Sequence, residues 1–268
     1  MRNGRTLKKS EEMRVAIVTG AAQGIGRRTA EVLGEAGYTL LLLDMQPCEA
    51  TLSAVRAAGA VVEALIGDIT DEAFIAQAVS LVTERWARVD VLVNNAGISF
   101  IAPAETIEAS AFRRVLEVNL VAPFVLSRAF GSIMLAQREG SIVNVASIAG
   151  LVGVSDRTAY NASKHGLIGL TRTLAGEWGG RGVRVNAVCP GWVKTEMDVA
   201  DQAGGGYTDD DITGRVPMAR FASPDDIARA ILFLADPAQS GFINGQALAV
   251  DGGWTSDGSW QSLRMRKR

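Results

Sequence analysis

The chain has 268 residues, of which 48% are hydrophobic and 21% charged; it can therefore bury a sizeable core and is neither disordered, collagen-like nor disulfide-rich. Its formal net charge is −2, and because residues 1–10 and 264–268 each carry four basic side chains, the body between them has about −10, which argues against nucleic acid as a partner. Two cysteines without a C-x-x-C motif and a single histidine argue against a metal site and favour a cytoplasmic location.

The sequence gives no sign of a membrane anchor or a secretory signal. No apolar run approaches the ~18 residues that a membrane-spanning helix needs, and no hydrophobic stretch follows the basic N-terminus. We therefore expect no membrane partner. Residues 1–12 and 256–268 are predicted to be terminal tails around one domain at 13–255, because no break in composition marks a second domain.

Apolar runs of strand length alternate with helical patterns along this domain. The first run ends in a glycine-rich turn, and residues 24–34 then carry apolar side chains at helical spacing. The runs are apolar throughout, as in parallel strands that are covered on both faces. This order predicts an α/β fold, a doubly wound, mostly parallel Rossmann-like sheet in three layers. The predicted strands are 15–19, 39–44, 61–66, 89–93, 141–145, 183–188 and 246–250.

Residues 198–215 depart from this pattern. They contain three consecutive glycines at 204–206 and three aspartates at 209–211, and they show little periodicity. This composition predicts a mobile surface segment. Loops of this length often act as lids over a site, and an insertion without function is the alternative.

The first predicted strand runs directly into the sequence TGAAQGIG at residues 19–26. A glycine-rich turn between strand and helix lets backbone amides approach a pyrophosphate, and the helix N-terminus adds favourable partial charge. Asp44 ends the second strand, where its carboxylate can accept hydrogen bonds from the adenosine ribose and would repel a 2′-phosphate. The sequence therefore favours NAD over NADP. Arg27 and Arg28 are the reservation, although a solvated helix face is their simplest interpretation.

Tyr160 and Lys164 form a second constellation. Because they lie four residues apart on a predicted helix, the phenol and the ammonium can point into one site. A tyrosine with its ordinary pKa of ~10 is a poor base at neutral pH, and a nearby ammonium lowers that pKa. Ser147 follows the predicted strand 141–145, where it can hydrogen-bond a substrate oxygen. Taken singly, such residues more often serve packing and capping than catalysis.

Together these residues resemble the short-chain dehydrogenase/reductase family over nearly the whole chain. The gap of 13 residues between Ser147 and Tyr160 is the family's usual spacing. The resemblance implies hydride transfer between a nicotinamide dinucleotide and a substrate. The matching motifs, in order, are T-G-x-x-x-G-I-G at 19–26, N-N-A-G at 94–97, Asn119, Ser147, Tyr160-x-x-x-Lys164 and Pro190-Gly191.

The resemblance implies a role for each of four candidate catalytic residues. Tyr160 would be the general acid/base, and Ser147 would orient and polarise the reacting oxygen. Lys164 would lower the pKa of the tyrosine and hold the nicotinamide ribose. Asn119 would hold a water that relays protons through the lysine. The hydride chemistry belongs to the cofactor, and the protein supplies orientation and proton transfer.

The resemblance also implies cofactor contacts at the ends of the third, fourth and sixth strands. With the glycine turn, Asp44 and the Tyr/Lys pair, the candidate cofactor-binding residues are Gly20, Gln23, Gly24, Ile25, Gly26, Asp44, Asp68, Ile69, Asn95, Ala96, Gly97, Tyr160, Lys164, Pro190, Val193 and Thr195.

The implied substrate pocket is mostly apolar, which favours a neutral secondary alcohol or ketone over a charged acyl-carrier substrate. Asp156 and Arg157 lie close to Tyr160 in the sequence and could bind hydroxyl groups. A sugar or polyol therefore remains a possible substrate. The candidate substrate-binding residues are Ser147, Ile148, Ala149 and Trp192, with Ser99, Phe100, Val154 and Met197 as further lining residues.

Three hypotheses remain at this point. The leading one is an NAD-dependent dehydrogenase of a secondary alcohol, which could be a polyol, a sugar or a cyclic or apolar alcohol. The second is an NADPH-dependent ketone or 3-oxoacyl reductase, separated from the first mainly by Asp44. The third is a dinucleotide-binding regulator without catalysis, against which the presence of Tyr160 and Lys164 argues.

Family analogy implies that residues 198–215 are the substrate lid and that the enzyme is a homotetramer, with the helices carrying Asn119 and Tyr160 at the interface.

Overall fold

The computed structural model describes residues 13–203, 206–260 and 263, and it contains a seven-stranded sheet in which all neighbouring strands are parallel. The strand order is β3-β2-β1-β4-β5-β6-β7, so the chain reverses its direction of winding between β1 and β4. The predicted Rossmann-like class is confirmed. The strands are β1 Arg14–Thr19, β2 Tyr38–Asp44, β3 Val62–Ile66, β4 Val91–Asn94, β5 Gly140–Val145, β6 Val183–Pro190 and β7 Ala247–Val250.

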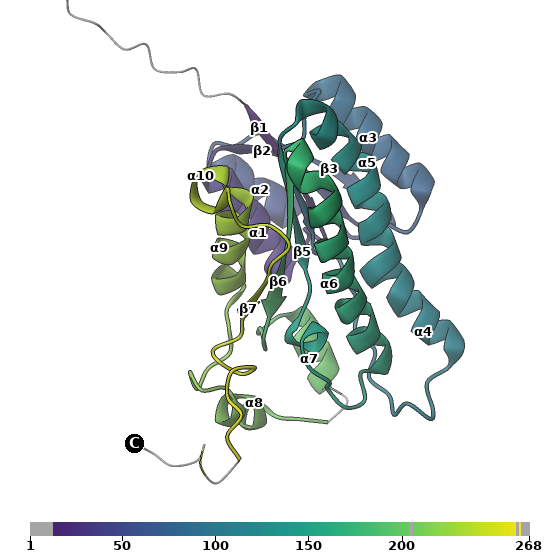
Figure 1. Cartoon of the computed structure of the whole chain (residues 1–268), viewed down its shortest axis with the longest axis vertical. Coiled ribbons are helices and arrows are strands. Elements are labelled where there is room, and N and C mark those ends of the chain that lie inside the picture. Colours follow the sequence, from purple (N-terminus) through teal and green to yellow (C-terminus); the bar gives the residue numbers. More distant parts are fainter. Residues whose placement is uncertain (1–12, 204–205, 261–262, 264–268) are drawn as a thin grey trace, which may run out of the picture.

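Helices cover both faces of the sheet, as Figure 1 shows. On one face lie α1 Gly24–Glu35, α2 Glu49–Ala57, α9 Pro224–Ala235 and the short α10 Pro237–Ser240. On the other lie α3 Glu72–Arg85, α4 Ala109–Leu116, α5 Ala122–Gln137 and α6 Thr158–Trp178. The remaining elements are the π-helix η1 Glu117–Val121, the 3-10 turns η2 Ile148–Gly150 and η3 Gly179–Arg181, and the helices α7 Glu196–Gln202 and α8 Asp209–Arg215.

The continuous apolar runs of the strands follow from this two-sided covering. Successive side chains of a strand point to opposite faces, so Leu40 and Leu42 pack under α1 and α2 while Leu41 and Leu43 pack under α3 and α5. All four leucines are fully buried. Burying both faces removes the polar positions that would otherwise give a strand its alternating pattern.

The segment Ala109–Gln137, which joins α4, η1 and α5, corrects the expectation that no part of the chain is long and apolar enough to cross a membrane. It passes that test by length and composition, and half of its apolar window is buried. Leu126, Phe130 and Met134 pack in the core against the sheet. Packing against the sheet therefore accounts for its apolar character.

The predicted irregular segment 198–215 contains two short helices instead, α7 and α8. Thr195 caps α7, its Oγ1 accepting a hydrogen bond from the Asp198 amide, and Thr208 and Asp211 form a reciprocal capping box on α8. A helix of seven residues has too few positions to show periodicity, which is why the pattern missed both. At the predicted C-terminal tail, Arg215 of α8 donates to the carbonyl of Asp257. The predicted tail 1–12 lies outside the described residues.

Candidate active site

A cavity of about 450 Å³ lies at the carboxyl ends of the strands, where β1 and β4 are neighbours and the winding reverses. Ligands of open α/β sheets bind at such a reversal, because the loops that leave adjacent strands diverge there. The cavity extends from Asp44 at the end of β2, past the glycine turn, to helix α7. It lies within the size range of small-molecule sites.

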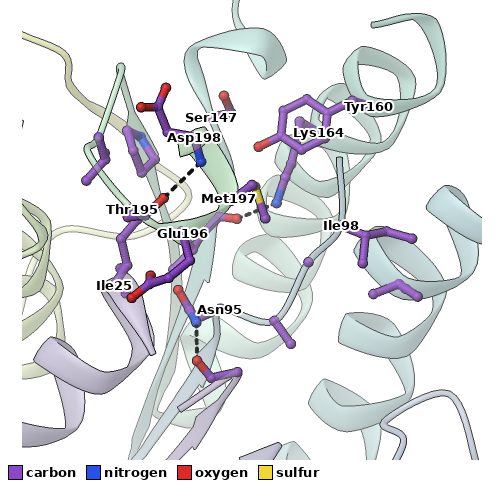
Figure 2. Close-up of a pocket in the computed structure, with 18 of the residues that line it drawn as sticks. Ile25, Asn95, Ile98, Ser147, Tyr160, Lys164, Thr195, Glu196, Met197 and Asp198 are labelled. Atoms are coloured by element: carbon purple, nitrogen blue, oxygen red, sulfur yellow. Dashed lines mark hydrogen bonds between the residues drawn. The ribbon is translucent and has the colours of Figure 1, made fainter. Parts of the chain in front are cut away.

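The glycine turn after β1 packs against the loop after β4. Gly20 has φ +64°, and a Cβ there would lie 2.8 Å from the Cα of Ala96, so a larger residue is excluded both by conformation and by space. Asn95 Nδ2 donates to the carbonyl oxygens of Thr19 and Gly20 at 2.9 and 3.0 Å. Figure 2 shows the Asn95 side chain in the cavity wall with one of its hydrogen bonds. The side chain of Asn95 therefore fixes the shape of the turn.

The N-terminus of α1 fits a diphosphate. Its N-cap residue, Gln23, has extended backbone angles and makes no side-chain capping bond, and the first turn contains no acidic residue. The terminal amides are thus left for a ligand, and the helix dipole favours a negative one. Gln23, Gly24 and Ile25 all line the cavity.

Gly26 was predicted to bind the cofactor but does not line the cavity. A Cβ at this position would overlap the carbonyl oxygen of Gly20 and the Asn95 amide. The absence of a side chain therefore serves the close packing of helix against turn, and a contact between Gly26 and the cofactor stays a prediction.

At the other end of the cavity, Asp44 is held by backbone amides. Its Oδ2 accepts from the Ala22 amide at 2.8 Å and its Oδ1 from the Gln46 amide at 2.9 Å. A carboxylate oxygen keeps a second lone pair when it accepts one bond, so Asp44 can still accept from a ribose hydroxyl. Nearby, Asp68 accepts from Thr70 and from Arg114, which also lines the cavity. Burial opposes the ionised form, but these bonds outweigh it and keep the pKa of Asp68 below its ordinary value.

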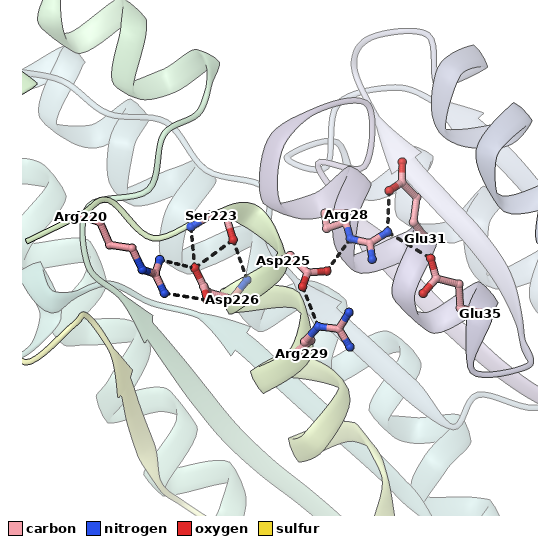
Figure 3. Close-up of polar contacts among 8 residues, drawn as sticks. All are labelled: Arg28, Glu31, Glu35, Arg220, Ser223, Asp225, Asp226 and Arg229. Carbon is pink, nitrogen blue, oxygen red and sulfur yellow. Dashed lines mark hydrogen bonds and ion pairs between the residues drawn. The ribbon is translucent and has the colours of Figure 1, made fainter. Parts of the chain in front are cut away.

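Arg27 and Arg28 do not reach this cavity. Figure 3 shows Arg28 between two helices, with Nε 2.8 Å from Asp225 on α9 and Nη1 3.0 and 3.1 Å from Glu31 and Glu35. Arg27 Nε lies 2.9 Å from Glu31. Both guanidinium groups are thus paired with carboxylates. The solvated helix face expected for Arg28 is wrong, since it links α1 to α9.

Ser147, Tyr160 and Lys164 line the middle of the cavity. Figure 2 shows Tyr160 and Lys164 side by side on α6 with Ser147 facing them. Lys164 Nζ lies 5.5 Å from the centroid of the Tyr160 ring and donates to the Val145 carbonyl at 2.8 Å. The structure therefore brings together three of the four candidate catalytic residues.

Burial shifts both titratable groups of this cluster toward their neutral forms. It raises the pKa of Tyr160, although the Ser147 hydroxyl and the charge of Arg157 oppose the shift. It lowers the pKa of Lys164 to about 8. Burial outweighs the favourable interactions and sets the direction of the shift for Tyr160. That Lys164 lowers this pKa stays a prediction.

Asn119, the fourth candidate, lies behind the cavity wall on the π-helix η1 and is fully buried. Its Oδ1 accepts from the Ile98 amide, and its Nδ2 donates to the Ile98 carbonyl and to Ser163 Oγ. A Cβ on Gly97 would lie 3.2 Å from Asn119 Oδ1 and 3.6 Å from Lys164 Nζ. Asn119 is thus close to the lysine across Gly97, and the proton relay stays a prediction.

The side of the cavity next to α7 contains residues that the sequence patterns did not reveal, above all Asp201 and Tyr207. Both residues lie in the segment 198–215, which was expected to be irregular. The only sequence feature that pointed to them was the expectation that this segment covers the site. Val154, Arg157 and Met197 line the cavity as expected, whereas Ser99, Phe100 and Asp156 do not. Arg157 and Asp201 thus add charged groups to a pocket that the sequence predicts to be mostly apolar.

The other predicted contact residues lie in the cavity wall. They are Asp68, Ile69, Asn95, Ala96, Gly97, Ile148, Ala149, Pro190, Trp192, Val193 and Thr195. Lining residues that the sequence reasoning missed include Met45, Gln46, Arg114, Val118 and Glu196.

A family model described as enoyl-(acyl carrier protein) reductase matches residues 20–255, which is most of the chain. The chain belongs to the short-chain dehydrogenase/reductase family. This membership accounts for the position of the cavity and for the glycine turn, and it supports binding of a nicotinamide nucleotide.

Two relatives of the chain are named for polyol substrates, and one similar solved structure is named for gluconate. The chain is 39% identical to D-threitol dehydrogenase of Mycolicibacterium smegmatis (90% of this chain, 93% of the relative) and 41% identical to galactitol 2-dehydrogenase (L-tagatose-forming) of Cereibacter sphaeroides (90% and 94%). A structure from Beutenbergia cavernae, described as an NAD(P)-dependent gluconate 5-dehydrogenase with NADP at low occupancy, is 43% identical with a TM-score of 0.85 (91% and 97%). The chain is therefore an oxidoreductase that acts on CH–OH groups.

Proposed function

We propose that this short-chain dehydrogenase/reductase is an NAD-preferring enzyme that interconverts a secondary alcohol and its ketone. The observation that carries the reaction is the meeting of Ser147, Tyr160 and Lys164 in the wall of the cavity that also contains the glycine turn. The alcohol would be a polyol, a sugar or a cyclic or apolar alcohol.

When bound, the nicotinamide supplies the hydride acceptor or donor. Tyr160 exchanges a proton with the substrate oxygen, and Ser147 donates a hydrogen bond that orients that oxygen. The buried ammonium of Lys164 holds the ribose hydroxyls next to the tyrosine. Asn119 completes the arrangement by holding the water of a proton relay behind Gly97. A phenol whose pKa is raised suits the proton donor of the reductive direction.

The preference for NAD is supported by the charges around Asp44. Its carboxylate is fixed by two backbone amides and would repel a 2′-phosphate. The basic candidates around this end, Arg27, Arg28 and Arg114, are each paired with a carboxylate. NADP would thus bring an extra phosphate to a place without a free cation among the described residues.

Calorimetric titration of the purified protein with NADH and with NADPH tests this proposal without a guess of substrate. Tighter binding of NADH supports it and directs the search for activity to secondary alcohols with NAD. Tighter binding of NADPH contradicts the preference, and binding of neither contradicts the cofactor assignment.

An NADPH-dependent ketone or 3-oxoacyl reductase is the second candidate. It is favoured by the reductase named in the matching family model and by the NADP in the Beutenbergia cavernae structure. The test is the reduction of small ketones and 3-oxoacyl thioesters with NADPH. Rates above those of alcohol oxidation with NAD would favour this reductase over the NAD-dependent dehydrogenase.

We also propose a homotetramer located in the cytoplasm. Val121 of η1 and Phe124 of α5 are apolar yet about 40% exposed, on the face expected to pack across the interface. Cys48 and Cys189 are buried free thiols, as expected of a protein in a reducing compartment. Sedimentation velocity measures the oligomeric state, and a monomer at micromolar concentration would contradict the homotetramer.

A further inference from the structure

The lid side of the cavity is built around an ion pair. Arg157 precedes α6 and is 9% exposed, and its Nη1 lies 2.8 Å from Oδ2 of Asp201 on α7. The hydroxyl of Ser99 accepts from the same Nη1 at 3.0 Å and donates to the same Oδ2 at 3.1 Å. Three segments that are distant in the sequence thus hold one another in a fixed geometry.

The protein's own hydrogen bonds occupy only some of the polar atoms of this ion pair. Within the described part of the chain, the hydrogen bonds of the pair go through Nη1 of Arg157 and Oδ2 of Asp201. The Nε and Nη2 donors and the Oδ1 acceptor are left, and both residues line the cavity. The guanidinium of Arg157 can donate to one hydroxyl group of a substrate, and the carboxylate of Asp201 can accept from a neighbouring hydroxyl. Two adjacent hydroxyls suit this pair because each hydroxyl can both donate and accept.

Two aromatic rings adjoin the pair. Trp192 and Tyr207 meet edge to face with ring centroids 4.9 Å apart, and the guanidinium carbon of Arg157 lies 5.5 and 6.0 Å from the two centroids. Both rings line the cavity. They supply apolar surface for the C–H groups of a carbon chain whose hydroxyls reach the ion pair.

The charges at this end disfavour an anionic substrate. Among the described residues lining it, the cations are Lys164, which is bonded to the Val145 carbonyl, and Arg157, which is neutralised by Asp201. Asp198 adds a second carboxylate to the same wall, and Lys194 Nζ lies 3.3 Å from its Oδ2. A carboxylate or phosphate on the substrate would meet the like charge of Asp201. It would have to compete with Asp201 for Arg157, the guanidinium that lines this end within the described part of the chain.

We propose that Arg157 and Asp201 make the enzyme selective for neutral polyols and sugars, by binding two neighbouring hydroxyls and rejecting substrates that carry an acidic group. This inference rests on the proposed function, because it names the substrate class of the same site.

The test compares kcat/KM with NAD for three substrate sets: linear tetritols to hexitols, the matching aldonates, and cyclohexanol. For the wild type we expect the polyols to lead both other sets. Asp201→Asn keeps the shape and removes the charge; we expect kcat/KM for polyols to fall about 10- to 100-fold, the effect of one charged hydrogen bond, while the aldonate-to-polyol ratio rises. Affinity for NADH stays unchanged, because Asp201 lies at the lid end. Asp209→Asn, which breaks an exposed ion pair with Lys194 outside the cavity, is the matched control and leaves the ranking as it was.

Arg157→Lys keeps the positive charge and loses the planar fork, so it lowers polyol activity without favouring aldonates. A wild type that prefers aldonates or cyclohexanol overturns the inference and leaves the proposed function standing. An Asp201→Asn enzyme that folds, binds NADH and keeps the wild-type ranking also overturns it. No turnover of any alcohol or ketone with either cofactor would instead refute the proposed function, and the inference with it. If Asp201→Asn does not fold, the wild-type ranking and Arg157→Lys decide.

Discussion

The ammonium of Lys164 donates to the carbonyl oxygen of Val145, the last residue of β5, at 2.8 Å. The bond ties the face of α6 that carries Tyr160 to the sheet edge that leads to Ser147. It also places a buried cation where its only described hydrogen-bond partner is a neutral carbonyl. Its charged form is therefore poorly compensated, which is why burial lowers the pKa of Lys164 to about 8.

This burial predicts a pH-dependent stability. Between pH about 8 and the ordinary lysine pKa of ~10.4, the native lysine is neutral while the unfolded one still binds a proton, so the free energy of unfolding rises with pH. Lys164→Met lacks this rise. From pH 7 to pH 10 the wild type should gain on the order of 1–3 kcal/mol relative to the variant in denaturant unfolding. Lys194→Met is the control, because ion pairs with Asp209 and Asp198 raise the pKa of Lys194, so that this lysine stays charged in the folded protein over the same pH range. Parallel pH curves for wild type and Lys164→Met contradict the prediction.

Tyr160→Phe tests the proton-transfer role. The substitution removes one hydroxyl, so we expect kcat to fall about 10²- to 10⁴-fold, the usual contribution of a general acid or base. Binding of NADH, measured by calorimetry, should stay nearly unchanged because the ring is retained. Wild-type turnover in the variant would remove Tyr160 from the mechanism.

Asp44→Asn removes the charge of this residue and keeps one of its two hydrogen bonds from backbone amides. The amide oxygen can still accept from the Ala22 amide, but the negative charge is gone. We expect the ratio of kcat/KM for NADP to that for NAD to rise about 10- to 100-fold, because a like-charge repulsion at close range is removed. Asp71→Asn, at the exposed N-cap of α3, is the control and leaves the ratio unchanged. An unaltered ratio in Asp44→Asn argues that the carboxylate does not set cofactor choice.

Gly26→Ala should destabilise the protein as well as weaken NADH binding. The added methyl group would overlap the Gly20 carbonyl, and overpacking of this kind costs about 1–3 kcal/mol. Gly176→Ala on α6 is the matched control: its Cβ meets nothing within 4 Å, so the free energy of unfolding should increase by roughly 0.5–1 kcal/mol. Loss of NADH binding at full stability would mean that Gly26 contacts the cofactor directly.

The sequence predicted the sheet well because its strands are buried on both faces and so differ in composition from everything around them. The glycine turn, Asp44 and the Tyr/Lys pair could be found for a related reason: each occupies the end of a strand or one face of a helix, where local order fixes the direction of the side chain. The Rossmann-like class and the family followed from these features.

The rest depended on contacts between segments far apart in the chain. The role proposed for Asp201 depends on its ion pair with Arg157, 44 residues away in the sequence, and the local sequence around either residue does not predict this pair. Arg28 was taken for a solvated residue because its partner Asp225 lies 197 residues further on. Gly26 fits a cofactor motif equally well whether it contacts the ligand or the turn, and only the packing against Gly20 distinguishes the two.

The strand order has a consequence for how the protein refolds. β1 lies between β2, its neighbour in the sequence, and β4, whose paired residues are about 75 positions away. The glycine turn meets the loop of Asn95 only after that distant pairing has formed, and Ser147 joins them one strand later. Pairing over such separations is slow compared with helix formation. In a refolding experiment, dinucleotide binding should therefore return after the helical circular-dichroism signal, and it reports that the sheet is complete.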